Sequence, residues 1–292
     1  MGRFRFVGLL LAVCALGAAG LAVAGQRDKE PPPPPVPLSA GAGPVGYTLA
    51  DSGPISLPDD SQTSGTAMCP SGTVVWGGGS IITSSDLRAN LNSSYPLTTE
   101  RGWKAYATNR SGAPTTFRVR AVCAKQPLGY KIVKKTFSMP AFWQSGGVAN
   151  CPSGSEALSG GGLSSSRDLL IWLNSTFPTI NSGGPAGWAT QFNNAGSVAT
   201  AKLTVYAVCA KPPNGFSIGV SDKVNSADHE DHDSFNCTNP SPVAIGAGVY
   251  SSSKNERVNI NGLAPRADGV DSYENNNGSD DERIATYGIC VS

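Results

Sequence analysis

The chain contains three copies of one sequence pattern, and no other feature constrains its fold as strongly. Residues 69–124 open with CPSGTVVWGGG, continue through NLNSSYP and GWKAYATN, and close with FRVRAVCA. Residues 151–210 keep the same order with CPSGSEALSGGG, WLNSTFP, GWATQFNN and LTVYAVCA. A divergent third copy runs from CTNPSPVAIGAG through VNINGLAP to IATYGICV. Self-similarity over roughly 80 residues is typical of a protein whose equivalent units bury one another's apolar faces.

A recurring dipeptide sets the borders of the copies. Gly46-Tyr47 returns as Gly129-Tyr130 and as Gly215-Phe216, in each case before the first cysteine of a copy. We therefore divide the folded part into repeat 1 (46–128), repeat 2 (129–214) and repeat 3 (215–292).

The segment before repeat 1 has the features of an exported protein. Residues 1–25 combine Arg3 and Arg5, an apolar run and an Ala-Val-Ala motif at 22–24, which predicts a secretory signal peptide. An uncleaved membrane anchor is the alternative. Residues 26–45 include five consecutive prolines and predict a disordered, stiffly extended linker. No later stretch is apolar enough to span a bilayer, so we expect a secreted, extracellular or cell-surface protein with no membrane span after signal cleavage.

Six cysteines remain once the leader is removed, and the repeat selects one pairing among fifteen. Each copy has one cysteine before its glycine-rich strand and one in its last strand. The predicted disulfides are Cys69–Cys123, Cys151–Cys209 and Cys237–Cys290. Closing loops of this size stabilises the fold by roughly 4 kcal/mol per bridge. A cysteine metal cluster is disfavoured because the sequence has no CxxC motif.

Short strands account for most of each repeat. In repeat 1 we predict strands over residues 47–50, 73–82, 90–94, 103–108 and 115–124, separated by Gly, Ser, Asn and Pro clusters. In the last strand, alternation predicts that Phe117, Val119, Ala121 and Cys123 face inward, and the same phase applies to Leu203, Val205, Ala207 and Cys209.

These strands predict an all-β fold in which three tandem antiparallel-sheet repeats pack about a pseudo-threefold axis, as in a β-prism. One antiparallel sheet has an apolar face that it cannot cover alone, and three such sheets facing one another would share a core. Three independent modules are the first alternative, but no flexible linker separates the copies. A β-trefoil is the second, and its units are usually shorter.

Glycines and tryptophans are the other landmarks. Gly77-Gly78-Gly79, Gly160-Gly161-Gly162 and Gly246-Ala247-Gly248 lie within predicted strands, where glycine indicates a bulge or the close approach of another backbone. A phosphate-binding loop is disfavoured because no Lys-Ser/Thr pair follows. Trp103 and Trp188 are expected in the core, with Tyr273 as their counterpart in repeat 3.

The charge balance excludes one class of partner. The chain without its leader has 20 basic and 21 acidic side chains, which argues against nucleic-acid binding. Repeat 3 alone is strongly acidic, with 5 basic and 12 acidic groups. This asymmetry predicts either a solvated surface or attraction to cations and basic partners.

One acidic stretch is a candidate metal site. Asp228, His229, Asp231, His232 and Asp233 combine imidazoles with carboxylates, which are ligands for zinc, calcium or another divalent cation. By comparison with the other repeats, we place this stretch in a loop between strands, where a solvated acidic loop is the alternative interpretation. We predict no other cofactor.

Catalytic motifs are weak, so we do not expect an enzyme. Both histidines lie in the acidic stretch, away from any G-x-S-x-G motif. The nearest approach to a glycosidase carboxylate pair is Glu156 with Asp168.

The pattern CPxGxxxxGGG, an Asn-Ser block ending in aromatic-Pro, GW and VYAVCA is similar to a repeat of small secreted or surface-exposed bacterial modules of uncharacterised function. It covers nearly all of residues 46–292. The plan of three cysteine-closed β units also looks like that of the vitelline membrane outer layer protein. That resemblance implies a β-prism of three Greek-key sheets with carbohydrate contacts. No specific motif of that family is matched, so no site residues are carried over from it.

The function that these features favour is non-catalytic binding. A rigid, exported β scaffold with Asn-, Ser-, Gly- and Tyr-rich loops offers amide and hydroxyl groups to a glycan or cell-envelope polymer. A protein-binding module and a passive surface coat are the alternatives, and a glycoside hydrolase is a remote one.

Overall fold

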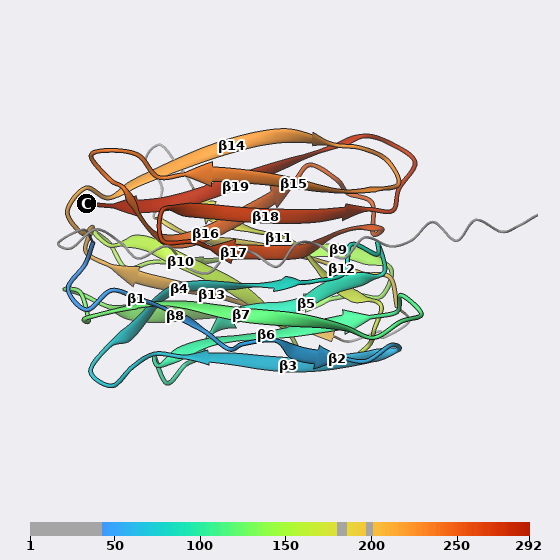
Figure 1. The fold of residues 1–292 in the computed structure, drawn as a ribbon, viewed down its shortest axis with the longest axis horizontal. Helices are drawn as coiled ribbons and strands as arrows, with labels where there is room; N and C mark the ends of the chain where they lie inside the picture. Colours follow the sequence, from blue (N-terminus) through green and yellow to red (C-terminus); the bar gives the residue numbers. More distant parts are fainter. Residues whose placement is uncertain (1–42, 180–185, 197–200) are drawn as a thin grey trace, which may run out of the picture.

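The chain folds into three antiparallel sheets (Figure 1). The computed structural model describes residues 43–179, 186–196 and 201–292, and these contain strands but no helix. The predicted signal peptide and most of the predicted linker fall on residues 1–42, outside the described part. The predicted all-β, β-prism-like fold class is confirmed.

The three repeats contribute strands in the same order. Repeat 1 contains β1 (Thr48–Asp51), β2 (Ile55–Leu57), β3 (Ser61–Met68), β4 (Val74–Ile82), β5 (Ala89–Pro96), β6 (Gly102–Asn109) and β7 (Thr115–Ala124). Repeat 2 contains β8 (Lys131–Met139), β9 (Trp143–Asn150), β10 (Glu156–Ser164), β11 (Ile171–Thr179), β12 (Gly187–Asn194) and β13 (Ala201–Ala210). Repeat 3 contains β14 (Ser217–Asn225), β15 (His229–Asn236), β16 (Val243–Ser251), β17 (Val258–Pro265), β18 (Gly269–Asn276) and β19 (Glu282–Val291). The sequence analysis did not predict β3, β9 and β15, because these strands are rich in polar residues and lack a clear apolar alternation. Many of their side chains are partly exposed.

Each sheet is shared between two repeats, which differs from the expected one sheet per repeat. The strand orders are β1-β7-β4-β17-β18-β15, with β2 also beside β7, then β3-β6-β5-β10-β13-β8, and β14-β19-β16-β11-β12-β9. We call the three places where strands of different repeats meet, β5–β10, β11–β16 and β17–β4, the junctions. Since repeat 1 joins repeat 2, repeat 2 joins repeat 3 and repeat 3 joins repeat 1, the ring is closed.

Glycine makes the junctions possible. A Cβ atom on Gly161 would lie 2.0 Å from the carbonyl oxygen of Ser94, and one on Gly79 would lie 1.9 Å from that of Leu263. Neither distance is sterically allowed, so only glycine permits these backbones to approach. The prediction that the glycine clusters permit the close approach of another backbone is therefore confirmed.

The three glycine-rich strands also bulge toward one another. The register shifts at equivalent places in β4, β10 and β16, at Trp76, Leu158 and Ile245. A Cβ on Gly77 would meet the carbonyl oxygen of Ile245 at 2.3 Å, and one on Gly246 would meet that of Leu158 at 2.0 Å. The bulges thus contact across the pseudo-threefold axis and seal the centre of the fold.

Tryptophan packs on the glycine next to each bulge in two of the repeats. Trp103 lies 2.5 Å from the Cβ position of Gly78, and Trp188 lies 2.2 Å from that of Gly160. The strand registers place Val270, opposite Phe235, at the position of these tryptophans, so the prediction of Tyr273 was wrong. Repeat 3 has Ala247 where the others have glycine, together with the smaller Val270 where they have tryptophan.

Buried asparagines connect each repeat to the next. Asn92 donates from Nδ2 to the carbonyl oxygen of Ile171 at 2.8 Å, and Asn174 donates to that of Val258 at 2.9 Å. Asn261 closes the ring by donating to that of Ala89 at 2.7 Å. All three side chains are buried. Because a buried carbonyl without a partner is costly, these bonds fix the relative position of the repeats.

The three disulfides follow the predicted pairing. Their sulfurs join Cys69 to Cys123, Cys151 to Cys209 and Cys237 to Cys290. The residues expected to face inward in β7 and β13 are all buried. Arg120 of β7, which alternates with these residues, is buried too, since it bonds to Asp51 and to the carbonyl oxygen of Pro265.

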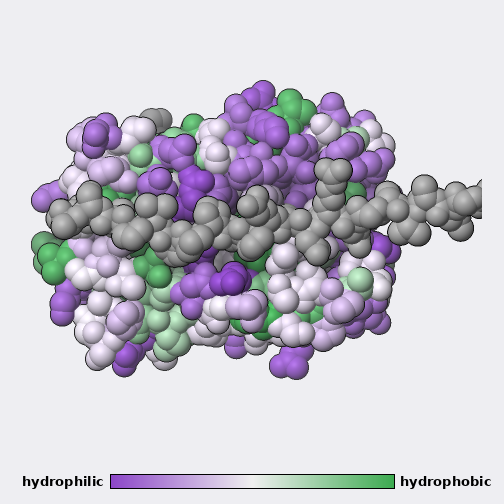
Figure 2. All heavy atoms as spheres, in the orientation of Figure 1, coloured by the Kyte–Doolittle hydropathy of each residue, from purple (hydrophilic) through white to green (hydrophobic). Residues whose placement is uncertain are grey.

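Repeat 3 gives one part of the surface its polar character. Figure 2 shows hydrophilic side chains gathered over the upper part of the molecule, where Figure 1 places β14, β15 and β18. This agrees with the acidic composition of the repeat.

Candidate functional site

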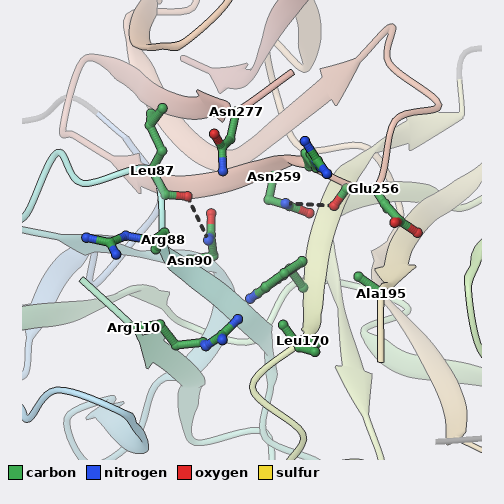
Figure 3. Close-up of a pocket in the computed structure, with 11 residues that line it drawn as sticks. Leu87, Arg88, Asn90, Arg110, Leu170, Ala195, Glu256, Asn259 and Asn277 are labelled. Atoms are coloured by element: carbon green, nitrogen blue, oxygen red, sulfur yellow. Dashed lines mark hydrogen bonds between the residues drawn. The ribbon is translucent and has the colours of Figure 1, made fainter. Parts of the chain in front are cut away.

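A pocket opens at one end of the molecule where loops of all three repeats meet (Figure 3). Its volume is about 280 Å³. The lining residues are Leu87, Arg88, Asn90, Arg110, Leu170, Trp172, Ala195, Glu256, Arg257, Asn259 and Asn277. We call this the axial pocket.

The lining positions are equivalent in the three repeats, although the side chains are not. Arg88, Leu170 and Arg257 each directly precede a strand, namely β5, β11 and β17. Asn90, Trp172 and Asn259 are each the second residue of those strands, and Arg110, Ala195 and Asn277 each directly follow β6, β12 and β18. Repeat 2 thus supplies an apolar wall, whereas repeats 1 and 3 supply guanidinium and amide groups.

Two of the three walls are held by pairs of asparagines. Asn275 donates from Nδ2 to Oδ1 of Asn90 at 3.0 Å, and Asn193 donates to Oδ1 of Asn259 at 3.0 Å. The Nδ2 atoms of Asn90 and Asn259 donate in turn to the carbonyl oxygens of Leu87 and Glu256, as the dashed lines in Figure 3 show. These amides are therefore held rigidly before any ligand binds.

The third wall breaks this pattern. Trp172 stands where the other repeats have Asn90 and Asn259, and Thr108 stands where they have Asn193 and Asn275. An indole has no carbonyl to accept an amide hydrogen bond, and the side chain of Thr108 bonds instead to the carbonyl oxygen of Asn90. Trp172 is 9% exposed, and its Nε1–H has no hydrogen-bond partner within the described part of the chain.

Positive charge dominates the rim of the pocket. Arg88 is bonded to Asp86 at 3.0 Å and to the carbonyl oxygen of Ser111, so its charge is partly neutralised. Arg110 and Arg257 are exposed and make no ion pair with any residue that the structure describes. In Figure 3 the side chain of Arg110 extends into the space between Asn90 and Leu170. Glu256 is the one lining carboxylate.

An aromatic turn lies at the same end of the molecule. Phe142, in the turn before β9, and Trp143, the first residue of β9, are 64% and 66% exposed. Trp143 is opposite Asn194, which directly precedes the pocket residue Ala195. Phe142 has a φ of 59°, and the equivalent residues Asp60 and Asp228 have 48° and 55°. A bulky residue in the left-handed region is rare and strained, and such strain is common at binding sites.

A second hollow lies on the sheet that repeats 1 and 2 share. Its volume is about 220 Å³. It is lined by Gln62, Asn92, Tyr106, Leu163, Ser164, Ser165, Ser166 and Arg167. Asn92 already bonds to the carbonyl oxygen of Ile171, so part of this lining is structural.

The candidate metal residues lie on a strand and not in the expected loop. They belong to β15, at the edge of its sheet, apart from Asp228, which ends the preceding turn. Alternation along a strand sends successive side chains to opposite faces, which separates His229, Asp231 and Asp233 from His232. No group of three or more His, Cys, Asp or Glu residues able to hold a metal occurs in residues 43–179, 186–196 and 201–292.

These side chains have other partners. Asp233 is buried and accepts hydrogen bonds from Ser221 and Thr286, at 3.0 and 2.6 Å. Burial alone would raise the pKa of Asp231, but the Ser226 amide and the Lys223 ammonium lower it. The ring of His232 stacks on Tyr273, with 4.6 Å between centroids. His229 bonds to the carbonyl oxygen of Ala227 at 2.8 Å.

The carboxylate pair considered for glycoside hydrolysis is not brought together. Glu156 is the first residue of β10, and Asp168 follows the last residue of the same strand. A strand of nine residues therefore separates the two groups. Asp168 instead holds the loop before β11, where its carboxylate accepts the Leu170 amide at 2.8 Å.

Sequence reasoning missed the axial pocket. Each of its walls comes from a different repeat, and only the ring closure brings them together. The available signal was a difference between copies: Asn90 and Asn259 agree, while Trp172 departs from them.

Comparison with known proteins gives a partial likeness. No family model matches the chain. A stretch of 64 residues is 39% identical to part of Shufflon protein B' of Escherichia coli. The match covers 22% of this chain and 13% of that protein, so it spans far less than two thirds of the relative.

The described residues include no helix with the length and apolar character needed to cross a bilayer. The three disulfides indicate an oxidising environment.

Proposed function

We propose that this chain is a secreted, non-catalytic binding protein whose axial pocket takes part of a glycan or of a cell-envelope polymer. The observation that carries the proposal is the lining itself, with rigid amides on two walls and an apolar wall containing Trp172 on the third. Sugars present hydroxyl groups to amides and C–H faces to apolar side chains, and this lining offers both.

The rigid scaffold favours such binding. The asparagine pairs and the closed ring of repeats hold the lining in place, so a ligand need not order it. Preorganised groups lower the entropic cost of association. Three disulfides add stability outside the cell, where the predicted signal peptide would direct the chain.

A glycan array probed with the full disulfide-bonded chain tests the proposal. Leu170→Trp fills the pocket, and Leu128→Trp is the matched control because Leu128 is 80% exposed and lies outside the pocket lining. We expect saccharide capture by the parent protein and by Leu128→Trp, and its loss in Leu170→Trp. Absence of saccharide capture, or capture that survives Leu170→Trp, would contradict the proposal.

Protein binding is the second candidate, and the exposed Phe142-Trp143 turn favours it. Aromatic side chains supply much of the binding energy in protein interfaces. Capture of one specific envelope protein that is lost in Phe142→Asp with Trp143→Ser, the residues found at the equivalent turn of repeat 1, would support this alternative. Capture of neither class would leave a passive surface coat.

A further inference from the structure

The axial pocket has a net positive charge, and two of its arginines take no part in the hydrogen bonds that hold the pocket together. Arg110 lines the pocket from repeat 1 and Arg257 from repeat 3. The two arginines occupy different positions in their repeats, and repeat 2 has an uncharged residue at both positions. The asparagine pairs and strands that hold the pocket involve neither guanidinium. Arg88 differs from both, since it is engaged by Asp86.

The acidic groups near the pocket do not offset this charge. Asp86 is committed to Arg88 and to the Arg88 amide, at 2.8 to 3.0 Å. Glu256 is the one carboxylate in the lining, against the three arginines Arg88, Arg110 and Arg257. This contrasts with repeat 3 as a whole, whose sequence has 12 acidic and 5 basic side chains.

One further donor faces no acceptor. The Nε1–H of Trp172 is buried without a hydrogen-bond partner among the described residues. A buried donor left unpaired costs about 1–3 kcal/mol, and a ligand oxygen would remove that cost. The pocket therefore combines two guanidinium groups and an indole donor, all of which bind oxygen acceptors.

We propose that the axial pocket selects an anionic sugar residue, one that bears a carboxylate or a phosphate, with Arg110, Arg257 and the Trp172 indole as its donors. This inference rests on the proposed function and adds the charge class of the ligand. Guanidinium groups bind carboxylate and phosphate oxygens in forked geometry, which an uncharged sugar cannot match.

Calorimetric titration of the full chain tests this selectivity. The probes are oligogalacturonate, a phosphorylated mannan fragment and uncharged galactan of equal length, with inorganic phosphate as a simple anion. The variants are Arg110→Gln, Arg257→Gln and Trp172→Phe, which remove one donor each and keep side-chain bulk. Arg101→Gln is the matched control, because Arg101 is exposed in the turn between β5 and β6, at the opposite end of those strands.

We expect each Arg→Gln variant to weaken binding of an anionic glycan about tenfold or more, as expected for a lost charge-assisted hydrogen bond. Trp172→Phe should weaken it roughly two- to tenfold, and Arg101→Gln should change nothing. Higher salt should weaken binding because the arginines are exposed. The probe that binds more tightly, carboxylated or phosphorylated, identifies the source of the anion.

Other outcomes separate this inference from the proposed function. Equal affinity for galactan and for the anionic probes, with loss in Leu170→Trp, would overturn the charge selectivity and leave a glycan pocket. No binding of any saccharide would overturn both. Binding of inorganic phosphate as tight as that of the glycans would overturn recognition of a sugar residue.

Discussion

The asparagines that link the repeats and the lining of the axial pocket occupy equivalent positions in three repeats, but only the linking asparagines are kept. Asn92, Asn174 and Asn261 are the same residue with the same role between each repeat and the next. The second residue of the same strands, by contrast, is asparagine twice and tryptophan once. Ring closure repeats one backbone geometry three times and therefore demands the same side chain each time. A pocket on the axis faces one ligand, which has no threefold symmetry, so its walls are free to differ.

The difference is coupled between repeats 1 and 2. Where Trp172 replaces asparagine, its neighbour in the ring is Thr108 in place of Asn193 or Asn275. A lone asparagine at 108 would find no amide partner on the indole, and an unpaired buried amide is costly. Because both asparagines of the pair are replaced, by Trp172 and Thr108, no buried amide is left without a partner at this wall.

The largest effect on stability should follow a change at a junction. In Gly161→Ala the new methyl group would lie 2.0 Å from the Ser94 carbonyl oxygen, where backbone must move. We expect a loss of more than about 3 kcal/mol in the free energy of unfolding, measured by denaturant titration. Gly112→Ala is the control, because its Cβ would meet nothing within 4 Å although its φ is +90°. We expect that change to cost about 1 kcal/mol. Equal costs for both would show that close backbone approach does not hold the junction.

An intermediate effect should come from Glu274 of β18, where repeat 3 has a buried carboxyl in place of an apolar side chain. Ala107 and Phe192 occupy the equivalent position in repeats 1 and 2. Burial raises the pKa of Glu274 from 4.5 to about 8, although hydrogen bonds from Asn225 and Ser251 oppose the rise. Between these pH values the folded protein keeps a proton that the unfolded chain has released. The contribution of Glu274 to stability is therefore fully present below pH 4.5 and is lost as the pH rises through about 8.

Glu274→Gln should remove that pH dependence. We expect a flatter profile of unfolding free energy from pH 5 to 8 and a gain of roughly 1–3 kcal/mol at pH 8, since no charge is then buried. Glu282→Gln is the control, because that carboxylate is bonded to Ser252 in an exposed contact. A profile for Glu274→Gln that parallels the parent protein would refute the assignment.

The smallest effect on stability should accompany the largest effect on binding. Thr108→Asn combined with Trp172→Asn gives the third wall the amide pair of the other two. We expect the double variant to lose about 1 kcal/mol less than the sum of the single variants, the net value of one buried hydrogen bond. Saccharide binding should nevertheless disappear, because asparagine at 172 removes the apolar wall as well as the indole donor. Additive losses, or retained binding, would show that the three walls are not interchangeable in the way the strand registers indicate.

Several features were predictable because they depend on local chemistry repeated along the chain. The disulfide pairing followed from one cysteine at each end of every copy, and the inward phase of β7 and β13 followed from alternation. The glycine clusters indicated close backbone contact before any partner was known. The polar strand β15 was misread as a loop, since an edge strand with exposed His and Asp side chains has no apolar alternation to reveal it.

The repeat by itself determined the strand types, the cross-links and the threefold plan, because each depends on patterns within a single copy. Tertiary structure alone decided which repeats share a sheet, that Val270 and not Tyr273 replaces the buried tryptophan, and that Trp172 faces Arg110 and Arg257 across one pocket. These features join residues far apart in the sequence, such as Asn261 and Ala89, which are 172 positions apart. Contacts over such separations depend on how the ring closes, and no pattern within one copy specifies that closure.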